Sequence, residues 1–275
     1  METKQKSFCE LVNTYEALEH IMGINGLHPH SLSTIERLHN KVIEHTSRRE
    51  GIILDIGCGS AYGTYNLSRL LPPGVSIIGI DINKAAIDKA QKLFEKQKNV
   101  SFFLGSLEEF YESHKQQNII GIISVSVSMF LYCTRSYYQT AYKMLEEGGI
   151  FIDAPFVFKS LNLQLSEQFK NETYQTCGCA MTMHTTDELE DFMNHANFKR
   201  IICNEREFEL MNLSILFQDY SPTYLFTQFI NNVCKPPAPL EHNSSWYLLR
   251  RTLGIFSFFL RNRTKFGATA IVGIK

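Results

Sequence analysis

The chain has 275 residues, of which 44% are apolar, and its 27 basic and 28 acidic side chains give a formal net charge of −1. That apolar fraction supports a large core and excludes general disorder. The balanced charge supplies no field that would attract a polyanion, so nucleic acid is not an expected partner. No apolar run reaches the roughly 18 residues that a membrane-spanning helix needs.

The first residues and the cysteines both indicate a cytoplasmic protein. The opening "METKQKSFCE" lacks the apolar h-region of a secretory signal. The 7 cysteines are an odd number and are scattered along the chain, which is typical of reduced thiols.

The first half of the chain alternates between strand and helix patterns. Two helical stretches, near 8–22 and 31–47, come first. Short apolar strands are then expected at 51–57, 75–81, 100–105, 119–127 and 149–155, with helices near 62–71, 83–97, 107–114 and 135–146 between them. This alternation with short connections predicts an α/β fold with a doubly wound, mostly parallel sheet, which the two later strands extend to seven strands.

The second half contains those two strands and a region that does not fit the alternation. A helix is expected at 185–198, a strand at 199–210 and a strong final strand at 266–275. We therefore expect a core formed by 49–210 and 264–275, a helical N-terminal segment, 1–48, that covers the cofactor site, and a helical cap, 211–263, that faces the substrate.

The stretch "LDIGCGSAYGT", residues 54–64, is a glycine-rich loop that follows the first core strand. Gly57 and Gly59 would let the backbone approach a ligand without a Cβ in the way. A dinucleotide loop requires a third glycine where this chain has Tyr62. Asp55 is the stronger objection, because a carboxylate repels a pyrophosphate and suits a ligand that carries an ammonium group. An NAD-linked oxidoreductase is therefore the weaker alternative.

Two further features follow the next strands. Asp81 ends the second strand, where a carboxylate accepts hydrogen bonds from the hydroxyls of a ribose; a simple helix cap is the alternative role. Ser106 and Leu107 follow the third strand, where an adenine ring would lie.

The ordered series "ILDIGCGSAYGT", "IIGIDIN", "FLGSLEEF", "IISVSVSMFLY" and "LEEGGIFIDAP" resembles the class I S-adenosylmethionine-dependent methyltransferases of the small-molecule type, which have a Rossmann-like fold. The resemblance covers roughly residues 50–206 and the last strand. It implies S-adenosylmethionine as the cofactor and S-adenosylhomocysteine as the product. It also implies these binding roles: Asp55, Gly57, Cys58 and Gly59 at the methionine end, Asp81 at the ribose, Ile82, Ser106 and Leu107 around the adenine, Ser126 facing the methyl donor, and Tyr15 at the cofactor carboxylate. The chain departs from the family pattern at Ser106, where many members have an acid.

The catalytic residues are less clearly indicated. An oxygen or nitrogen nucleophile often needs a base, and His28, His30 and His184 are the candidates. Tyr132 is a further catalytic candidate, and it could orient the acceptor together with Tyr137 and Tyr138. A position on a loop surface is the alternative for His28 and His30, and a position at the start of a helix is the alternative for His184. No spacing singles out any of these candidates, and no metal is required.

The acceptor is expected to be a small or medium organic molecule. The sequence after the fourth strand, "SVSMFLY", lacks the tetrapeptide that is typical of base and amide methylation, and the neutral net charge agrees. The expected reaction is methyl transfer to an O or N nucleophile by in-line displacement. The alternatives are a methyltransferase that acts on lipid at a membrane surface, suggested by the aromatic and basic residues of 246–263, and a protein that binds the cofactor without turnover. The oligomeric state is not indicated.

Overall fold

The computed structural model describes residues 32–47, 49–115, 117–177, 180–203, 223, 227, 258, 261–262 and 264–275. The expected helix at 8–22 and nearly all of the expected cap lie outside these residues. Tyr15, His28 and His30 lie outside them as well.

The described residues form a seven-stranded sheet with the strand order β3-β2-β1-β4-β5-β10-β8. Its members are β1 (Gly51–Ile56), β2 (Val75–Asp81), β3 (Val100–Leu104), β4 (Ile119–Val125), β5 (Leu145–Ala154), β8 (Arg200–Cys203) and β10 (Ile271–Ile274). The first five run parallel, whereas β10 is antiparallel to both of its neighbours. The predicted fold class is confirmed.

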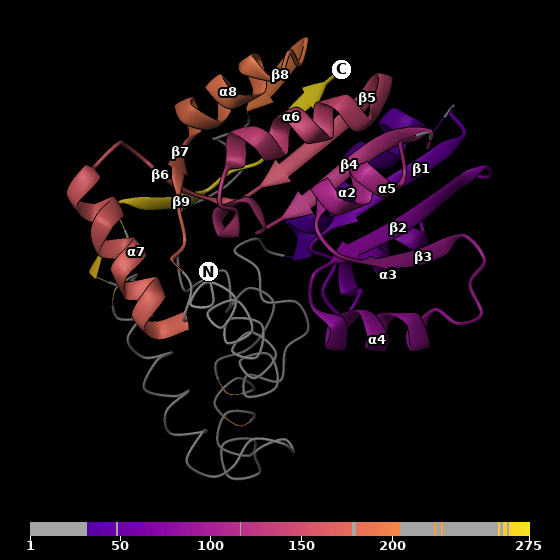
Figure 1. Ribbon diagram of the computed structural model, residues 1–275, viewed down its shortest axis with the longest axis horizontal. Coiled ribbons are helices and arrows are strands. Elements are labelled where there is room, and N and C mark those ends of the chain that lie inside the picture. The colour runs from indigo at the N-terminus through magenta and orange to yellow at the C-terminus, as the bar shows by residue number, and fades with distance from the viewer. Residues whose placement is uncertain are drawn as a thin grey trace.

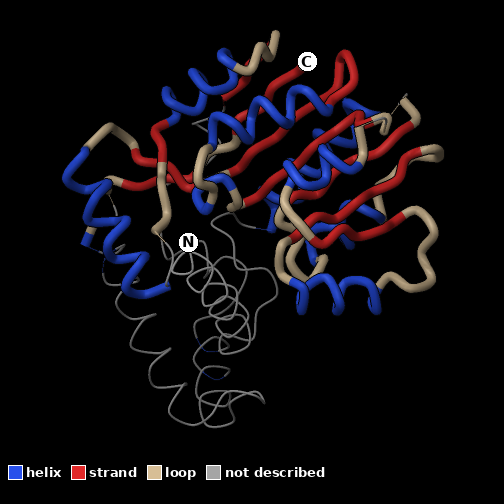
Figure 2. Tube along the Cα trace, viewed as in Figure 1, coloured by secondary structure: helices blue, strands red, loops and turns tan. Residues whose placement is uncertain are grey.

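Helices cover both faces of this sheet (Figures 1 and 2). They are α2 (Leu32–Thr46), α3 (Tyr62–Ser68), α4 (Lys84–Leu93), α5 (Leu107–Ser113), α6 (Thr134–Met144) and α8 (Thr186–His195). Side chains of α2 and α3 join one apolar cluster with β1, β2, β4 and β5. Side chains of α5, α6 and α8 join the cluster on the other face. Because both faces are covered, the central strands are nearly continuous apolar runs.

Helix starts follow local capping chemistry. The Asn83 side chain accepts hydrogen bonds from two backbone amides at the start of α4. Ser106 and Thr185 each form a capping box with a glutamate three residues later, at α5 and α8. These caps fix where the chain leaves the carboxyl end of β3 and where α8 begins.

The expected strand at 266–275 is wrong as a single element. The structure divides it into β9 (Phe266–Ala268) and β10, which lie in different sheets. β5 stops in the same way at Ala154 and is followed by β6 (Phe156–Phe158), which pairs with β9. Pro155 separates β5 from β6, and a proline cannot donate to the ladder. The two paired strands therefore bend together, and Thr269 donates its backbone N–H to the Pro155 carbonyl at 3.2 Å.

The bend creates a second sheet with the order β7-β6-β9, where β7 is His184–Thr185. Helix α7 (Leu163–Cys177), which the sequence patterns did not predict, lies beside it (Figure 1). Phe158, Phe169, Met181 and Phe266 are buried in the aromatic and methionine-rich cluster that joins this helix to the small sheet. The second sheet adds a wall next to the carboxyl ends of β4 and β5.

Candidate active site

The site lies where the strand order reverses, between β1 and β4. From β1 the chain continues outward to β2 and β3, whereas β4 and β5 lie on the other side. Parallel sheets bind ligands in the crevice beyond the carboxyl ends of the strands at such a point. The loops after β1, β2, β3 and β4 all leave the sheet at this edge.

The glycine loop turns tightly over the end of β2. The backbone amides of Gly57 and Cys58 both donate to the Ile80 carbonyl, at 2.7 and 3.1 Å. Gly57 has a φ of 68°, and a Cβ there would lie 2.3 Å from Val127 Cγ2. Gly59 has a φ of 54°, but a Cβ there would meet nothing within 4 Å. Gly57 is therefore required by packing and conformation, and Gly59 by conformation alone.

Asp81 anchors this loop from the end of β2. One carboxylate oxygen accepts the Gly59 N–H at 2.8 Å, and the other accepts the Asn83 N–H at 2.8 Å. A carboxylate offers about four lone-pair positions, so it can accept further hydrogen bonds from a diol. Ile82 follows with 42% of its surface exposed, as a side chain that packs on a ligand ring would be.

Asp55 lies beneath the loop with only 8% of its surface exposed. Thr64 Oγ1 donates to it at 2.6 Å. Burial raises the pKa of Asp55 to about 6, the bond from Thr64 opposes this rise, and the charge of Asp81 adds to it. Two carboxylates that disfavour each other's charge form a site that suits a cation.

Cys58 lies between the two glycines and is buried. Burial, together with the charges of Asp55 and Asp81, raises the pKa of its thiol. The thiol is therefore not an activated nucleophile.

Ser106 caps α5 and shares its turn with an acid that the sequence analysis did not single out. The Glu109 N–H donates to Ser106 Oγ at 3.2 Å, and Glu109 Oε2 accepts the Ser106 N–H at 2.8 Å. The S-x-x-E spacing is the signal that could have identified Glu109. Leu107 is buried, with 2% of its surface exposed.

We call residues 126–130, which follow β4, the β4 turn. Ser126 has a φ of 62°, which is unusual for a residue with a Cβ, and it donates its N–H to the Ala154 carbonyl at 2.9 Å. Val127 packs against Gly57, and the Met129 carbonyl accepts the Thr182 N–H at 2.9 Å. The β4 turn therefore contacts both the glycine loop and the segment before β7.

His184 is the candidate base that the structure brings to this turn. Its Nε2 lies 3.0 Å from Thr134 Oγ1, which in turn lies 3.4 Å from the Ser128 carbonyl. Burial lowers the pKa of His184, and the charge of Glu188 opposes that effect. A neutral imidazole can accept a proton.

The tyrosine candidates separate into two groups. Tyr132 has 96% of its surface exposed, whereas Tyr137 and Tyr138 are buried on α6. The Tyr138 hydroxyl donates to Asp153 Oδ2 at 2.7 Å. Asp153, which the sequence analysis did not identify, is fully buried on β5. No local motif marks it, because its partners come from other elements.

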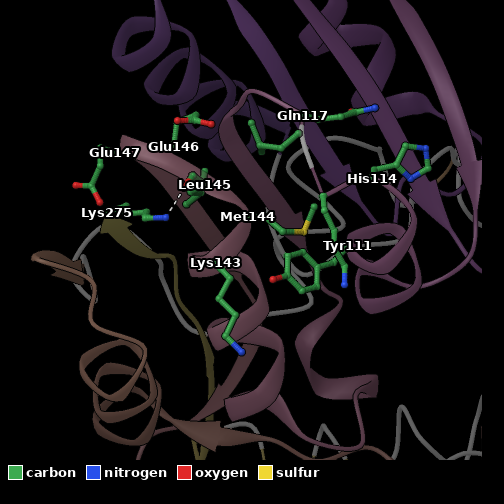
Figure 3. A pocket seen from close by; sticks show the side chains of 11 residues that line it. Tyr111, His114, Gln117, Lys143, Met144, Leu145, Glu146, Glu147 and Lys275 are labelled. Carbon is green, nitrogen blue, oxygen red and sulfur yellow. Dashed lines mark hydrogen bonds between the residues drawn. The ribbon is translucent and has the colours of Figure 1, made fainter.

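A cavity of about 260 Å³ opens at the opposite edge of the sheet (Figure 3). It is lined by residues at the starts of β4 and β5 and at the ends of α5 and α6, and Lys143 and Lys275 are among them. The Lys275 ammonium already donates to the Leu145 carbonyl at 2.6 Å. This cavity is remote from the glycine loop and is not the candidate active site.

The residues at the carboxyl edge fit an ammonium-bearing nucleoside better than a dinucleotide. Asp55 and Asp81 carry the negative charge, the two glycines leave the backbone open, and no basic side chain of the described loop residues 57–64 is available for a pyrophosphate. This donor set agrees with S-adenosylmethionine.

Comparison with known proteins gives the family. The model of the methyltransferase domain family matches residues 47–206 of the chain. The chain belongs to this family, and the expected class I S-adenosylmethionine-dependent methyltransferase is confirmed.

Individual relatives are distant. The arsenite methyltransferase of Halobacterium salinarum is 22% identical over 157 residues, which are 54% of this chain and 37% of that protein. The match thus spans little more than a third of the curated relative.

Solved structures agree in fold. A protein of Galdieria sulphuraria with a provisional assignment as a sarcosine dimethylglycine methyltransferase has a TM-score of 0.72 at 13% identity and covers 96% of this chain and 98% of its own. A methyltransferase of Thiobacillus denitrificans in complex with S-adenosylhomocysteine has a TM-score of 0.62 at 12% identity, covering 93% of this chain and 96% of its own. At these identities the likeness shows the fold.

Proposed function

We propose that this protein transfers a methyl group from S-adenosylmethionine to an O or N nucleophile of a small or medium organic acceptor. The observation that carries the proposal is the pair of acids, Asp55 and Asp81, on either side of a glycine loop at the switch point of the sheet. Membership of the methyltransferase domain family supports it independently.

On the donor side, we assign a role to each candidate residue of the loops after β1, β2 and β3. Asp55 receives the ammonium of the methionine end, with Gly57, Cys58 and Gly59 lining its path. Asp81 accepts the ribose hydroxyls. Ile82 packs on the adenine, and Ser106 and Leu107 border its edge. The cofactor supplies the electrophilic methyl group, so the protein's own contribution is to hold donor and acceptor in line, which can lower the barrier by roughly 7–11 kcal/mol.

The acceptor side is formed by the β4 turn and the second sheet. Ser126 faces the methyl donor, and His184 accepts the proton that an oxygen or nitrogen nucleophile releases. Four further roles stay predictions: contact with the cofactor carboxylate for Tyr15, and catalysis for His28, His30 and Tyr132. In this proposal 211–263 caps the acceptor, and the segment 1–48 covers the donor through residues that precede α2, because α2 itself packs against the face of the sheet.

The proposed acceptor is a small molecule enclosed in the site, not a polymer such as nucleic acid. The nearly balanced net charge of −1 supplies no field that would attract nucleic acid. Among the described residues no helix is long and apolar enough to cross a bilayer. The proposal therefore favours a cytoplasmic metabolite or natural product as the acceptor. A membrane lipid is the alternative acceptor.

Incubation with methyl-labelled S-adenosylmethionine and a metabolite extract tests the proposal. We expect a labelled small molecule that is absent when Asp81→Ala replaces the wild type. Binding of S-adenosylhomocysteine without any labelled product would instead support the second candidate, a protein that binds the cofactor without turnover. The observation in its favour is that Ser106 serves as a helix cap, at the position where the family resemblance leads us to expect an acid.

A further inference from the structure

A carboxylate that the proposed mechanism does not use lies beside the β4 turn. Asp153 is fully buried near the end of β5, and no basic side chain of the described residues pairs with it. Ser124 Oγ donates to one of its oxygens at 2.7 Å and the Tyr138 hydroxyl donates to the other at 2.7 Å. Burial raises the pKa of Asp153, while hydrogen bonds from Ser124, Tyr138 and Ser128 oppose that rise. Such a group is expensive to bury, so a role beyond packing is expected.

The bonds of Asp153 join the elements that hold the β4 turn. Ser124 lies in β4, two residues before the turn, and Tyr138 lies in α6, which follows it. Ala154, the next residue after Asp153, accepts the N–H of Ser126 through its carbonyl. One carboxylate thus links the strand that enters the turn, the strand beside it and the helix that leaves it.

The turn itself needs such support. Ser126 has a φ of 62°, and a residue with a Cβ stays in that region only when its surroundings hold it there. The Ser126 hydroxyl oxygen is buried and has no hydrogen-bond partner among the described residues, so its own side chain does not hold it. Val127 transmits any shift to the donor loop, because it packs against Gly57.

We propose that Asp153 is a positioning residue for methyl transfer, whose contacts with Ser124 and Tyr138 fix the β4 turn against the glycine loop. The proposal rests on the methyl-transfer function proposed above. Asp153 does not touch the donor or the acceptor in this proposal. It acts through the place and rigidity of Ser126 and Val127.

The test compares Asp153→Asn, Tyr138→Phe and the double variant with the wild type. Asparagine keeps the volume but presents an N–H to a hydroxyl donor, and phenylalanine removes one donor while Ser124 and Ser128 stay. Thr46→Val is the matched control, because Thr46 is fully buried and its hydroxyl donates to Val42 within α2, outside the site.

Four quantities are measured for each variant. Two report on function: the initial rate of label transfer at saturating S-adenosylmethionine with the metabolite extract as acceptor, and the calorimetric Kd of S-adenosylhomocysteine. Two report on structure: the free energy of unfolding in urea, and the amide NMR shifts of residues 126–130 in the complex with S-adenosylhomocysteine.

We expect Asp153→Asn to lower the rate at least about tenfold, since misplacement of about 1 Å can cost 100-fold, while the Kd changes less than about threefold. Tyr138→Phe should lower the rate about threefold. The rate of the double variant should lie within about twofold of the rate of Asp153→Asn, because both changes disturb the same contact between Tyr138 and Asp153. The amide shifts of the β4 turn should move in these variants and not in Thr46→Val.

An undiminished rate with unmoved turn amides in Asp153→Asn would overturn the proposal. Additive losses that follow the fall in stability, and that Thr46→Val reproduces, would also overturn it by showing a structural role alone. If Asp153→Asn fails to fold, Tyr138→Phe carries the test. A wild type that yields no labelled product refutes methyl transfer itself, whereas a wild type and Asp153→Asn that are equally active refute the Asp153 role alone.

Discussion

The two halves of the carboxyl edge are built in different ways. In the donor half, the loops after β1, β2 and β3, the contacts join backbone amides or near neighbours: Gly57 to Ile80, Gly59 to Asp81, and Thr64 to Asp55, nine residues apart. In the acceptor half the contacts join side chains from distant elements. Ser124 reaches Asp153 across 29 residues, and His184 reaches Thr134 across 50.

This difference explains which half of the site can differ between members of a family. The glycine loop is tied to the end of β2 by its own backbone amides, and the β4 turn contacts it through Val127. A wall made of side chains from β4, β5, α6 and the second sheet changes with each substitution. The donor can therefore be common to a family while the acceptor is particular to one member.

The largest effect is expected in the acceptor half. His184→Gln should lower the rate of label transfer about 100-fold or more, because it removes the proton acceptor, and it should leave the affinity for S-adenosylhomocysteine within about twofold. Since burial lowers the pKa of His184, the imidazole is neutral at pH 7, and the wild-type rate should fall as pH decreases through that lowered pKa. His195→Gln, an exposed histidine of α8, is the matched control. An unchanged rate would assign His184 to packing against Phe192, whose ring centroid lies 5.0 Å from that of His184.

The second prediction concerns the donor half. Asp81→Ala should weaken S-adenosylhomocysteine binding about 100-fold, since hydrogen bonds to a charged group contribute about 1.5–3 kcal/mol each. Calorimetry measures this, with Asp88→Ala as control, because Asp88 is exposed and paired with Lys84 on the surface of α4. Undiminished binding would contradict the ribose role.

The third prediction separates the two glycines by stability. Gly57→Ala places a Cβ 2.3 Å from Val127 at a φ of 68°, so we expect it to lower the free energy of unfolding by about 2–4 kcal/mol. Gly59→Ala has the strained φ without the clash and should lower it by only about 1 kcal/mol. Urea denaturation measures both values. Equal losses would show that Val127 moves away from the added Cβ without a cost in stability.

The fourth prediction concerns pH. The pKa of Asp55 is raised to about 6, and a bound ammonium would lower it by favouring the ionised form. The affinity for S-adenosylhomocysteine is therefore fully present above pH 6 and decreases as pH falls through 6, about tenfold by pH 5. Thr64→Val should move the decrease to higher pH, because the bond from Thr64 lowers this pKa. Asp55→Asn should abolish the decrease, and a decrease that persists in it would exclude Asp55 as its source.

The smallest effect is expected at Ser106. Ser106→Ala should reduce stability by about 1 kcal/mol through loss of the helix cap and change the affinity for S-adenosylhomocysteine by less than about threefold. Ser106→Asp keeps a capping oxygen and introduces the acid that the family resemblance leads us to expect at this position, so it should bind S-adenosylhomocysteine more tightly than the wild type. A large loss of affinity in Ser106→Ala would show that the hydroxyl contacts the adenine directly.

Much of the fold could be predicted because its strands are buried on both faces. "GIILDI" and "IIGIISV" are nearly continuous apolar runs, and their lengths of 6 and 7 residues are typical of buried strands rather than helices. The bend at Pro155 and the division of the last strand could not be predicted, because both depend on pairing of β5–β6 with β9–β10 across more than 100 residues. The helix at Leu163–Cys177 was missed because its amphipathic pattern is weak.

The sequence by itself determined the donor half. The order of strands and glycines, together with the positions of Asp55 and Asp81, indicates the cofactor. This was possible because the shape of the glycine loop follows from the conformation of its own backbone. Only the tertiary structure decided the acceptor half. It brought His184 to the β4 turn, left Tyr132 exposed and buried Asp153 under Ser124 and Tyr138. These side chains lie on helices and strands whose neighbours are determined by packing and strand pairing. The spacing of residues along the chain does not show which elements become neighbours.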